Sequence, residues 1–167
     1  GTIGYLRHDL GASWYHSVAE DVVLGLKGST GIIQKTQKPI RVVDSVMLGA
    51  DSLRGFEYGG LGPRDTATGD SLGGTRYWTT TAEMMFPIGL PNEFGVKGAV
   101  FTDAGAVWSP GQTTSTVIDD KAVRSSAGFG IAWTSPFGPL RIDYAIPIRK
   151  QRIDRLQRVL FGFSTRF

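Results

Sequence analysis

Two-residue alternation of apolar and polar side chains is the feature of this sequence that most constrains its fold. Within residues 140–149, apolar side chains occupy the even positions, while Arg, Asp, Ala, Pro and Arg occupy the odd ones. Residues 123–134 and 159–167 alternate in the same way. Because successive side chains of a strand point to opposite faces, each segment has one apolar face and one small or charged face. The pattern predicts an all-β fold.

Four further segments, roughly 3–16, 22–33, 75–86 and 96–108, fit the alternation less closely. They bring the expected total to about seven antiparallel strands of about 10–14 residues. Such strands exceed the ~5–6 residues usual in soluble proteins and approach the ~9–11 tilted residues that cross a bilayer. The 23 glycines and 8 prolines favour turns between strands over helices.

Two architectures fit strands of this kind. In a soluble β-sandwich the apolar faces pack together, whereas in a membrane barrel they face lipid and the polar faces line a lumen. Arg124, Arg141 and Asp143 lie on the polar faces, as a lumen requires, and we expect Arg141 and Asp143 to neutralise luminal neighbours. These charges favour an antiparallel transmembrane β-barrel segment.

The lengths of the connections point the same way. Short connections are expected at 18–21, 87–95 and 135–139, and they alternate with a very long one at 31–74, a longer one at 109–122 and an intermediate one at 150–158. Outer-membrane barrels have short turns at one end and long loops at the other. Four tryptophans would suit the aromatic girdles at the two membrane surfaces, although buried core positions are the alternative: Trp14, Trp78, Trp108 and Trp133.

Several short motifs occur in a fixed order along the chain. They are Leu53-Arg-Gly-Phe56 with Gly62-Pro-Arg64, Phe101-Thr-Asp-Ala-Gly105, and Ser135-Pro-Phe-Gly-Pro-Leu-Arg141 followed by Ile-Asp143. Together they resemble the C-terminal barrel part of the BamA family of outer-membrane assembly factors. The resemblance runs from about Gly4 to Phe167. Related secretion translocators and autotransporter-assembly barrels share the loop motif.

The resemblance implies a barrel of sixteen strands, of which residues 1–167 supply the C-terminal portion, with no periplasmic POTRA domain among them. Seven strands leave two unpaired edges, and each orphan polar group costs several kcal/mol in lipid. We therefore expect the chain to be part of a longer barrel, to associate with another copy of itself, or to pair with detergent or foreign strands.

The resemblance also assigns a role to the long connection over residues 31–74. It implies a loop that folds into the lumen and presents Leu53, Arg54, Gly55 and Phe56 to the inner wall. Carried over by motif, the partners of Arg54 are Glu83 and Asp103. Two roles are possible for this site. It could be a luminal salt bridge that only holds the loop and barrel together, or it could have a mechanical role such as gating the lateral seam.

The terminal strand forms a second candidate site. Its alternating aromatics, Phe161, Phe163 and Phe167, resemble the β-signal by which outer-membrane proteins are recognised. In an intact family member the same strand would form a seam where client strands add by edge pairing. The alternative is that these rings only face lipid.

Composition narrows the function classes. A net charge of +3 is too small to indicate nucleic-acid binding. The chain has no cysteine, no phosphate-binding loop and no hydrolase elbow, and its two histidines, His8 and His16, have no evident third metal ligand. We expect a protein that is not an enzyme and needs no cofactor. The basic loop at 150–158 is expected to be solvated or to contact lipopolysaccharide.

The resemblance implies an integral protein of the bacterial outer membrane that inserts other barrels by offering strand edges and disturbing the bilayer. Its expected partners are outer-membrane lipid, nascent outer-membrane proteins and, in the intact protein, the lipoproteins of the assembly machinery. A polypeptide translocator of a secretion or autotransporter-assembly system is one alternative. A soluble β-sandwich that serves as a binding module is another.

Overall fold

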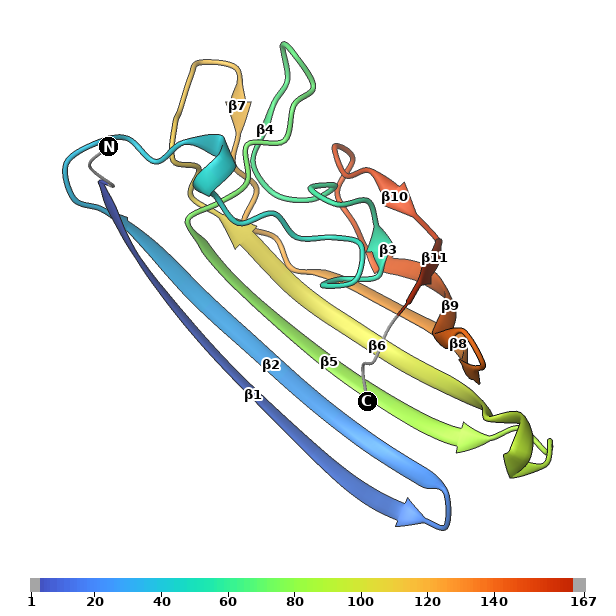
Figure 1. Cartoon of the computed structure of the whole chain (residues 1–167). Coiled ribbons are helices and arrows are strands. Elements are labelled where there is room, and N and C mark those ends of the chain that lie inside the picture. The colour runs from blue at the N-terminus through green and yellow to red at the C-terminus, as the bar shows by residue number, and fades with distance from the viewer. Residues whose placement is uncertain (1–3, 164–167) are drawn as a thin grey trace.

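A single curved antiparallel sheet dominates the computed structural model, which describes residues 4–163 (Figure 1). Seven strands follow one another in the order β1-β2-β5-β6-β8-β9-β11. Their bounds are β1 Tyr5–Ala19, β2 Val22–Lys35, β5 Arg76–Pro87, β6 Val96–Trp108, β8 Arg124–Ser135, β9 Gly138–Arg149 and β11 Val159–Gly162. This arrangement confirms the predicted all-β fold with seven antiparallel strands.

The remaining elements are short and lie in the connections. They are β3 Gly55–Phe56, β4 Arg64–Asp65, β7 Val117–Ile118, β10 Leu156–Gln157 and the 3-10 helices η1 Val42–Asp44 and η2 Asn92–Phe94. Strand β3 pairs with β10, and β4 pairs with β7. No helix in the described range 4–163 is long and apolar enough to cross a membrane.

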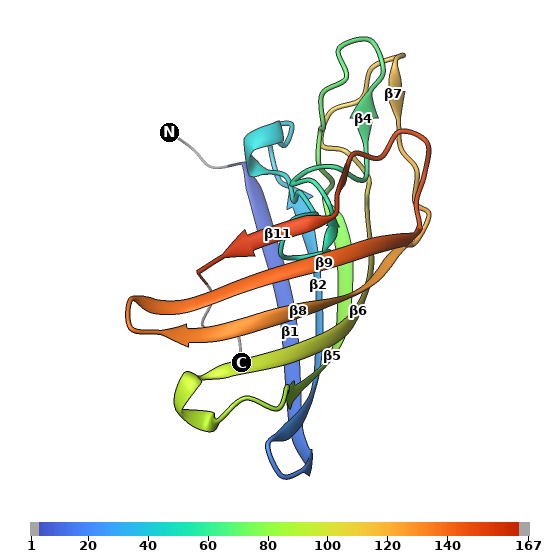
Figure 2. The ribbon, with the colours of Figure 1, turned by 90° about the vertical axis from the view of Figure 1, so that its right-hand side faces the viewer.

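The long and short connections lie at opposite ends of the sheet, as predicted. The β2–β5, β6–β8 and β9–β11 loops gather at one end, and the β1–β2, β5–β6 and β8–β9 turns lie at the other (Figures 1 and 2). Strands β1 and β11 are the two edges of the sheet, and they do not pair with each other in the part of the chain that the structure describes. The sheet is therefore an open segment.

The outer face of the sheet is apolar and exposed. Phe129 and Ile131 on β8 and Ile142 and Ile146 on β9 are each about half exposed. In a soluble sandwich, a second sheet of comparable size would cover these side chains. Apart from the seven-stranded sheet, residues 4–163 form only two pairs of two-residue strands. An exposed apolar face of this extent fits a sheet that meets lipid.

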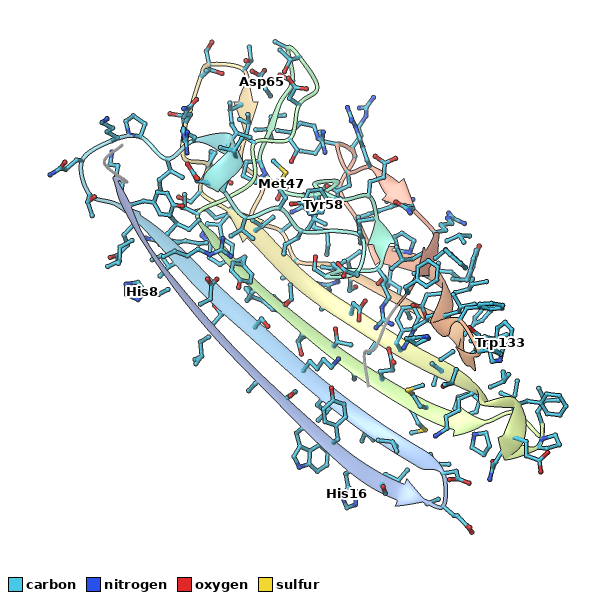
Figure 3. The ribbon with its side chains drawn as sticks, in the orientation of Figure 1. His8, His16, Met47, Tyr58, Asp65 and Trp133 are labelled. Atoms are coloured by element: carbon cyan, nitrogen blue, oxygen red, sulfur yellow. The ribbon has the colours of Figure 1, made fainter. Side chains whose placement is uncertain are left out.

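The four tryptophans divide between the two ends of the sheet. Trp14 and Trp133 lie toward the short turns, whereas Trp78 and Trp108 lie toward the long loops. Each has the sequence parity of its strand's outer face, and the side chain of Trp133 projects outward in Figure 3. Aromatic side chains in two bands, one at each membrane surface, are typical of transmembrane barrels.

The core lies on the inner side of the sheet, beneath the β2–β5 loop. It consists of Ile33, Ile40, Val46, Leu48, Leu53, Phe56, Leu61 and Val107, with Tyr5, Tyr77 and Leu156 packed against it. Most of these side chains come from the loop itself. The loop is thus a packed part of the fold.

The structure corrects the predicted start of this loop. Strand β2 continues to Lys35, slightly past the expected strand end near residue 33 and into the connection expected at 31–74. Gly31 pairs with Tyr77 inside the sheet, and a Cβ atom there would lie 2.5 Å from both the Tyr77 ring and Asp9 Oδ1. Gly31 therefore lies inside a strand, where its lack of a side chain makes room for two neighbouring side chains.

Candidate functional site

The β2–β5 loop, residues 36–75, folds back onto the inner faces of β6, β8 and β9. Gly55 lies against β8 and β9 and has a φ of +98°, which favours glycine. A Cβ atom at this position would lie 3.3 Å from Ser126 Cβ and Pro147 Cγ and 3.5 Å from Ala145 Cβ. Glycine therefore provides both the backbone conformation and the space for the loop to meet the wall.

Arg54 is buried against the inner wall and binds the first predicted carboxylate, Asp103, bidentately. Its Nε donates to Asp103 Oδ2 at 2.8 Å and its Nη2 donates to Oδ1 at 2.9 Å. The backbone N–H of Arg54 also donates to Oδ2, at 3.1 Å. Only the planar guanidinium of arginine can make the paired side-chain contact. Asp103 is 1% exposed, so Arg54 neutralises a charge that water cannot reach.

Glu83, the second predicted partner, joins Arg54 to another arginine. Arg54 Nη1 donates to Glu83 Oε2 at 2.7 Å, while Arg141 Nη1 and Nη2 donate to Oε1 and Oε2 at 2.6 and 2.9 Å. Arg141 Nε also donates to both oxygens of Asp143, at 3.0 and 2.9 Å. Two guanidinium groups and three carboxylates from the loop, β5, β6 and β9 thus form one network.

The network has an aromatic floor that the sequence interpretation missed. The Cζ atom of Arg54 lies 3.5 Å from the centroid of the Phe101 ring, so the guanidinium stacks on it. Phe101 and Asp103 have the same sequence parity, so an inward-facing Asp103 brings the Phe101 ring to the same face. In the structure the whole odd-numbered face of β6 points inward, and Phe101 is 5% exposed.

The electrostatics of the site hold Arg54 in its charged form. Burial on its own would lower the pKa of Arg54, but hydrogen bonds to Asp103 and Glu83 and the charges of these carboxylates outweigh it. The net effect raises the pKa of Arg54 above its ordinary value. A group that stays charged at all physiological pH values cannot act as an acid or base, so the arrangement supports binding and positioning.

The other two motif residues anchor the loop through apolar contacts. Leu53 and Phe56 are completely buried in the core cluster. Leu53 packs over Gly105 of β6, where a Cβ atom would lie only 3.0 Å from Leu53 Cδ1. All four residues of the motif therefore contribute to docking: two by apolar packing, one by charge and one by its lack of a side chain.

The terminal strand is only partly described. Phe161 lies in β11, pairs in register with Ile142 of β9 and is 58% exposed. Phe163 follows the strand, is also exposed and contacts Phe161 edge to face, with the ring centroids 6.0 Å apart. Phe167 lies outside the described residues. The two described rings do not contact the Arg54 network by hydrogen bonds or stacking within residues 4–163.

The histidines lie apart from this site. His8 and His16 project from the free edge of β1 in Figure 3, and the His16 ring stacks on Trp14 with 5.5 Å between centroids. No group of three histidine, aspartate or glutamate side chains suited to hold a metal ion is found among the described residues.

Comparison with known proteins identifies the family. A family model described as the Omp85 superfamily domain matches residues 1–167. The outer membrane protein assembly factor BamA of Neorickettsia risticii (strain Illinois) is 37% identical over 169 residues, which cover 100% of this chain and 23% of that protein. BamA of Neisseria meningitidis serogroup B is 29% identical and covers 93% of this chain and 23% of its own length.

A solved structure supports the same assignment. The crystal structure of BamA from Haemophilus ducreyi lacking POTRA domains 1-3 superposes with a TM-score of 0.78 at 26% sequence identity. The match covers 95% of this chain and 34% of that one. The chain thus spans less than a quarter of the curated relatives and a third of the solved barrel protein. These relatives are named as assembly factors of the outer membrane, not as enzymes. The chain belongs to the Omp85 superfamily, and it is an integral outer-membrane protein whose seven-stranded antiparallel sheet matches part of the BamA β-barrel.

Proposed function

We propose that the protein inserts newly made β-barrel proteins into the outer membrane, as an assembly factor that uses no cofactor. The observation that carries this proposal is the Arg54 loop, which is seated on the inner wall by carboxylates from two strands and an aromatic ring. Such a loop holds the inner wall in one shape without offering a reactive group. The names of the relatives support assembly over polypeptide translocation.

The terminal strand is the second part of the proposal. β11 is an edge strand, Phe161 lies in it and Phe163 directly follows it, and both aromatic side chains are exposed. An edge strand presents unpaired backbone groups that template pairing with another strand. We propose that client strands add at this edge and that the bilayer is disturbed beside it. The clients are nascent outer-membrane proteins, and the lipoproteins of the assembly machinery would bind the intact protein.

The opposite edge, β1, must also be paired in lipid, because an unsatisfied backbone group there costs several kcal/mol. Fifteen residues of β1 leave one side without a partner strand in the described range. We propose that further strands of a longer chain cover this side. A second copy of the chain is the other possible cover, and the native mass in detergent separates the two.

The test uses the full-length protein in liposomes that receive an unfolded outer-membrane barrel as client. Arg54→Ala should slow client folding strongly, and Arg54→Lys should slow it less because it retains the charge but loses the bidentate contact. Arg7→Ala is the matched control, since Arg7 lies on the inner face of β1 away from the loop. Client folding at the unmodified rate by Arg54→Ala would refute the proposal. Export of a soluble polypeptide in place of client folding would indicate a translocator.

A further inference from the structure

We infer that the β9–β11 loop, residues 150–158, couples the β2–β5 loop, which carries Arg54, to the terminal strand. A shift of the β2–β5 loop then moves β11. In this proposal Gly60, Arg124 and Asp154 act as positioning residues for β11. This inference rests on the proposed function only in assuming that client strands add at the terminal strand. The sequence predicted a solvated basic loop here, and its pairing with the β2–β5 loop was not foreseen.

The first link is a short sheet between the two loops. Gly55 pairs with Gln157 and Phe56 pairs with Leu156, in the antiparallel β3–β10 ladder. Leu156 also packs against the core cluster that contains Phe56. The residues that follow Arg54 are thus bonded to the residues that precede β11, and Arg158 alone separates β10 from β11.

The second link extends this sheet along the backbone. Glu57 N–H donates to the Arg155 carbonyl at 3.0 Å, and Arg155 N–H donates to the Gly60 carbonyl at 2.8 Å. Gly60 sits directly against this junction, because a Cβ atom there would lie 2.5 Å from the Arg155 oxygen and 2.7 Å from the Glu57 oxygen. The two loops therefore meet backbone to backbone, with no side chain between them.

The third link ties the loop to the sheet on its other side. Arg124 of β8 and Asp154 have completely buried side chains and form a bidentate pair, with Nε–Oδ2 and Nη2–Oδ1 distances of 3.0 Å each. Asp154 also accepts a bond from Gln151 N–H at 2.7 Å, and Arg124 Nη1 donates to the carbonyls of Asp120 and Ala122. A buried pair with this many bonds fixes the loop, since breaking it leaves a buried charge unpaired.

The terminal strand itself has few bonds that would resist movement of the loop. Four residues of β11, Val159–Gly162, pair with β9, whereas β8 pairs with β9 along nearly its whole length. The adjoining contact is Ala145 N–H to the Arg158 carbonyl, at 2.7 Å. A displacement of β10 should therefore shift the pairing of β11 before it disturbs the rest of the sheet.

The experiment places a wedge at the loop junction and reads the pairing of β11 with a disulfide. Gly60→Ala should push the Arg155 carbonyl away, and Gly28→Ala is the control because its Cβ would meet nothing closer than 3.9 Å. The reporter is Tyr144→Cys with Val159→Cys in the full-length protein, with any other cysteine replaced. Ala145 bonds to Arg158, so Tyr144 and Val159 form the adjacent, closer pair, which suits a disulfide.

Gly60→Ala should lower the yield of this disulfide in a redox buffer, because a loss of ~1 kcal/mol in pairing lowers the equilibrium constant for its formation about fivefold. Arg54→Ala should lower it as well, and the two changes together should not add, because they act along one path. An unchanged yield in Gly60→Ala, or fully additive effects, would overturn the inference. If Gly60→Ala loses the heat-modifiable gel mobility of a folded barrel, Asp154→Asn replaces it with the same expected outcomes.

The readout separates this inference from the proposed function. Disulfide formation is measured without a client, so it reports only the link between the loop and β11. A reduced yield together with normal client folding would support the link and count against the proposed use of the terminal strand. An unchanged yield together with slow client folding in Arg54→Ala would support the proposed function and overturn the link.

Discussion

Two arginine–aspartate pairs on the inner face of the sheet differ in almost everything except their chemistry. Arg7 and Asp9 on β1 are 2.6 Å apart at their closest atoms, and both side chains are more than 40% exposed. Arg54 and Asp103 are slightly farther apart, at 2.8 Å, but their side chains are 8% and 1% exposed. Distance alone would rank the first pair higher. Burial reverses this ranking of the two pairs, because water cannot solvate the charge of Asp103 if Arg54 is removed.

The difference arises from what covers each pair. Above β6, β8 and β9 the β2–β5 loop supplies Leu53, Phe56 and Arg54 itself. Above β1 there is no such cover in the described part of the chain, and Asp9 is completed only by Tyr77, whose hydroxyl donates to it at 2.8 Å. The same alternation thus produces a rigid wall on one side and an open one on the other.

The largest expected effect comes from removing the buried cation. Arg54→Ala leaves Asp103 buried without a counter-ion, which should cost about 3–5 kcal/mol in the free energy of unfolding. Urea unfolding in detergent, followed by the shift between folded and unfolded gel mobility, measures it. A loss below ~1 kcal/mol would mean that burial does not set the strength of this pair.

The second effect tests whether the loop can dock because the inner wall has no side chain at Gly105. Gly105→Ala places a Cβ atom 2.7 Å from the Trp78 carbonyl oxygen and 3.0 Å from Leu53 Cδ1. Overpacking of this kind should cost about 1–3 kcal/mol and make the loop more sensitive to protease. Gly11→Ala, on the uncovered inner face of β1, where a Cβ atom would lie 3.4 Å from Ser29 Oγ, should leave both quantities unchanged. Equal effects of the two substitutions would remove the distinction between the two walls.

The exposed pair should respond much less. Arg7→Ala should cost less than ~1 kcal/mol, as is usual for a solvent-exposed ion pair. The same unfolding measurement at low and high salt should show that this small contribution is screened. A loss comparable to that of Arg54→Ala would mean that burial does not separate the two pairs.

The smallest effect concerns the outer loops, where Asp65 lies (Figure 3). The Thr116 hydroxyl and the Ala67 N–H donate to its carboxylate at 2.7 and 2.9 Å, and these bonds hold the pKa of Asp65 below its usual range. Because the pKa of Asp65 is lower in the folded loop than in the unfolded chain, the charged carboxylate stabilises the folded loop at pH values above the unfolded-state pKa. This stabilisation is lost as the pH falls through the folded-state pKa. Protease cleavage within residues 63–72 should therefore increase on acidification below about pH 4. Asp65→Asn should abolish this pH dependence.

The alternation predicted which faces are buried because it is a local property. The side chains of Arg141 and Ile142 point to opposite faces whatever strand lies beside them, and the structure places them so. Strand register is not local. That Arg141 reaches Glu83 on a strand three places away in the sheet, and that Phe101 lies beneath Arg54, depend on stagger and curvature that no segment encodes by itself.

The loops show the same limit more strongly. Arg54 could be matched to Glu83 and Asp103 only through the family resemblance, since 29 and 49 residues of sequence separate them. The β3–β10 ladder joins two-residue segments with no alternation long enough to read. Asp154 lies in a basic loop that the sequence predicted to be solvated, yet its buried side chain forms an ion pair with the buried Arg124.

The stacking of Arg54 on Phe101 also has a consequence for chemical reactivity. One face of this guanidinium is covered by the ring, and its nitrogens are bonded to two carboxylates. A dicarbonyl reagent that attacks arginine should therefore modify exposed arginines such as Arg152 and Arg158 while sparing Arg54. Any event that lifts the loop from the wall would make Arg54 reactive, which mass spectrometry can detect without altering the sequence.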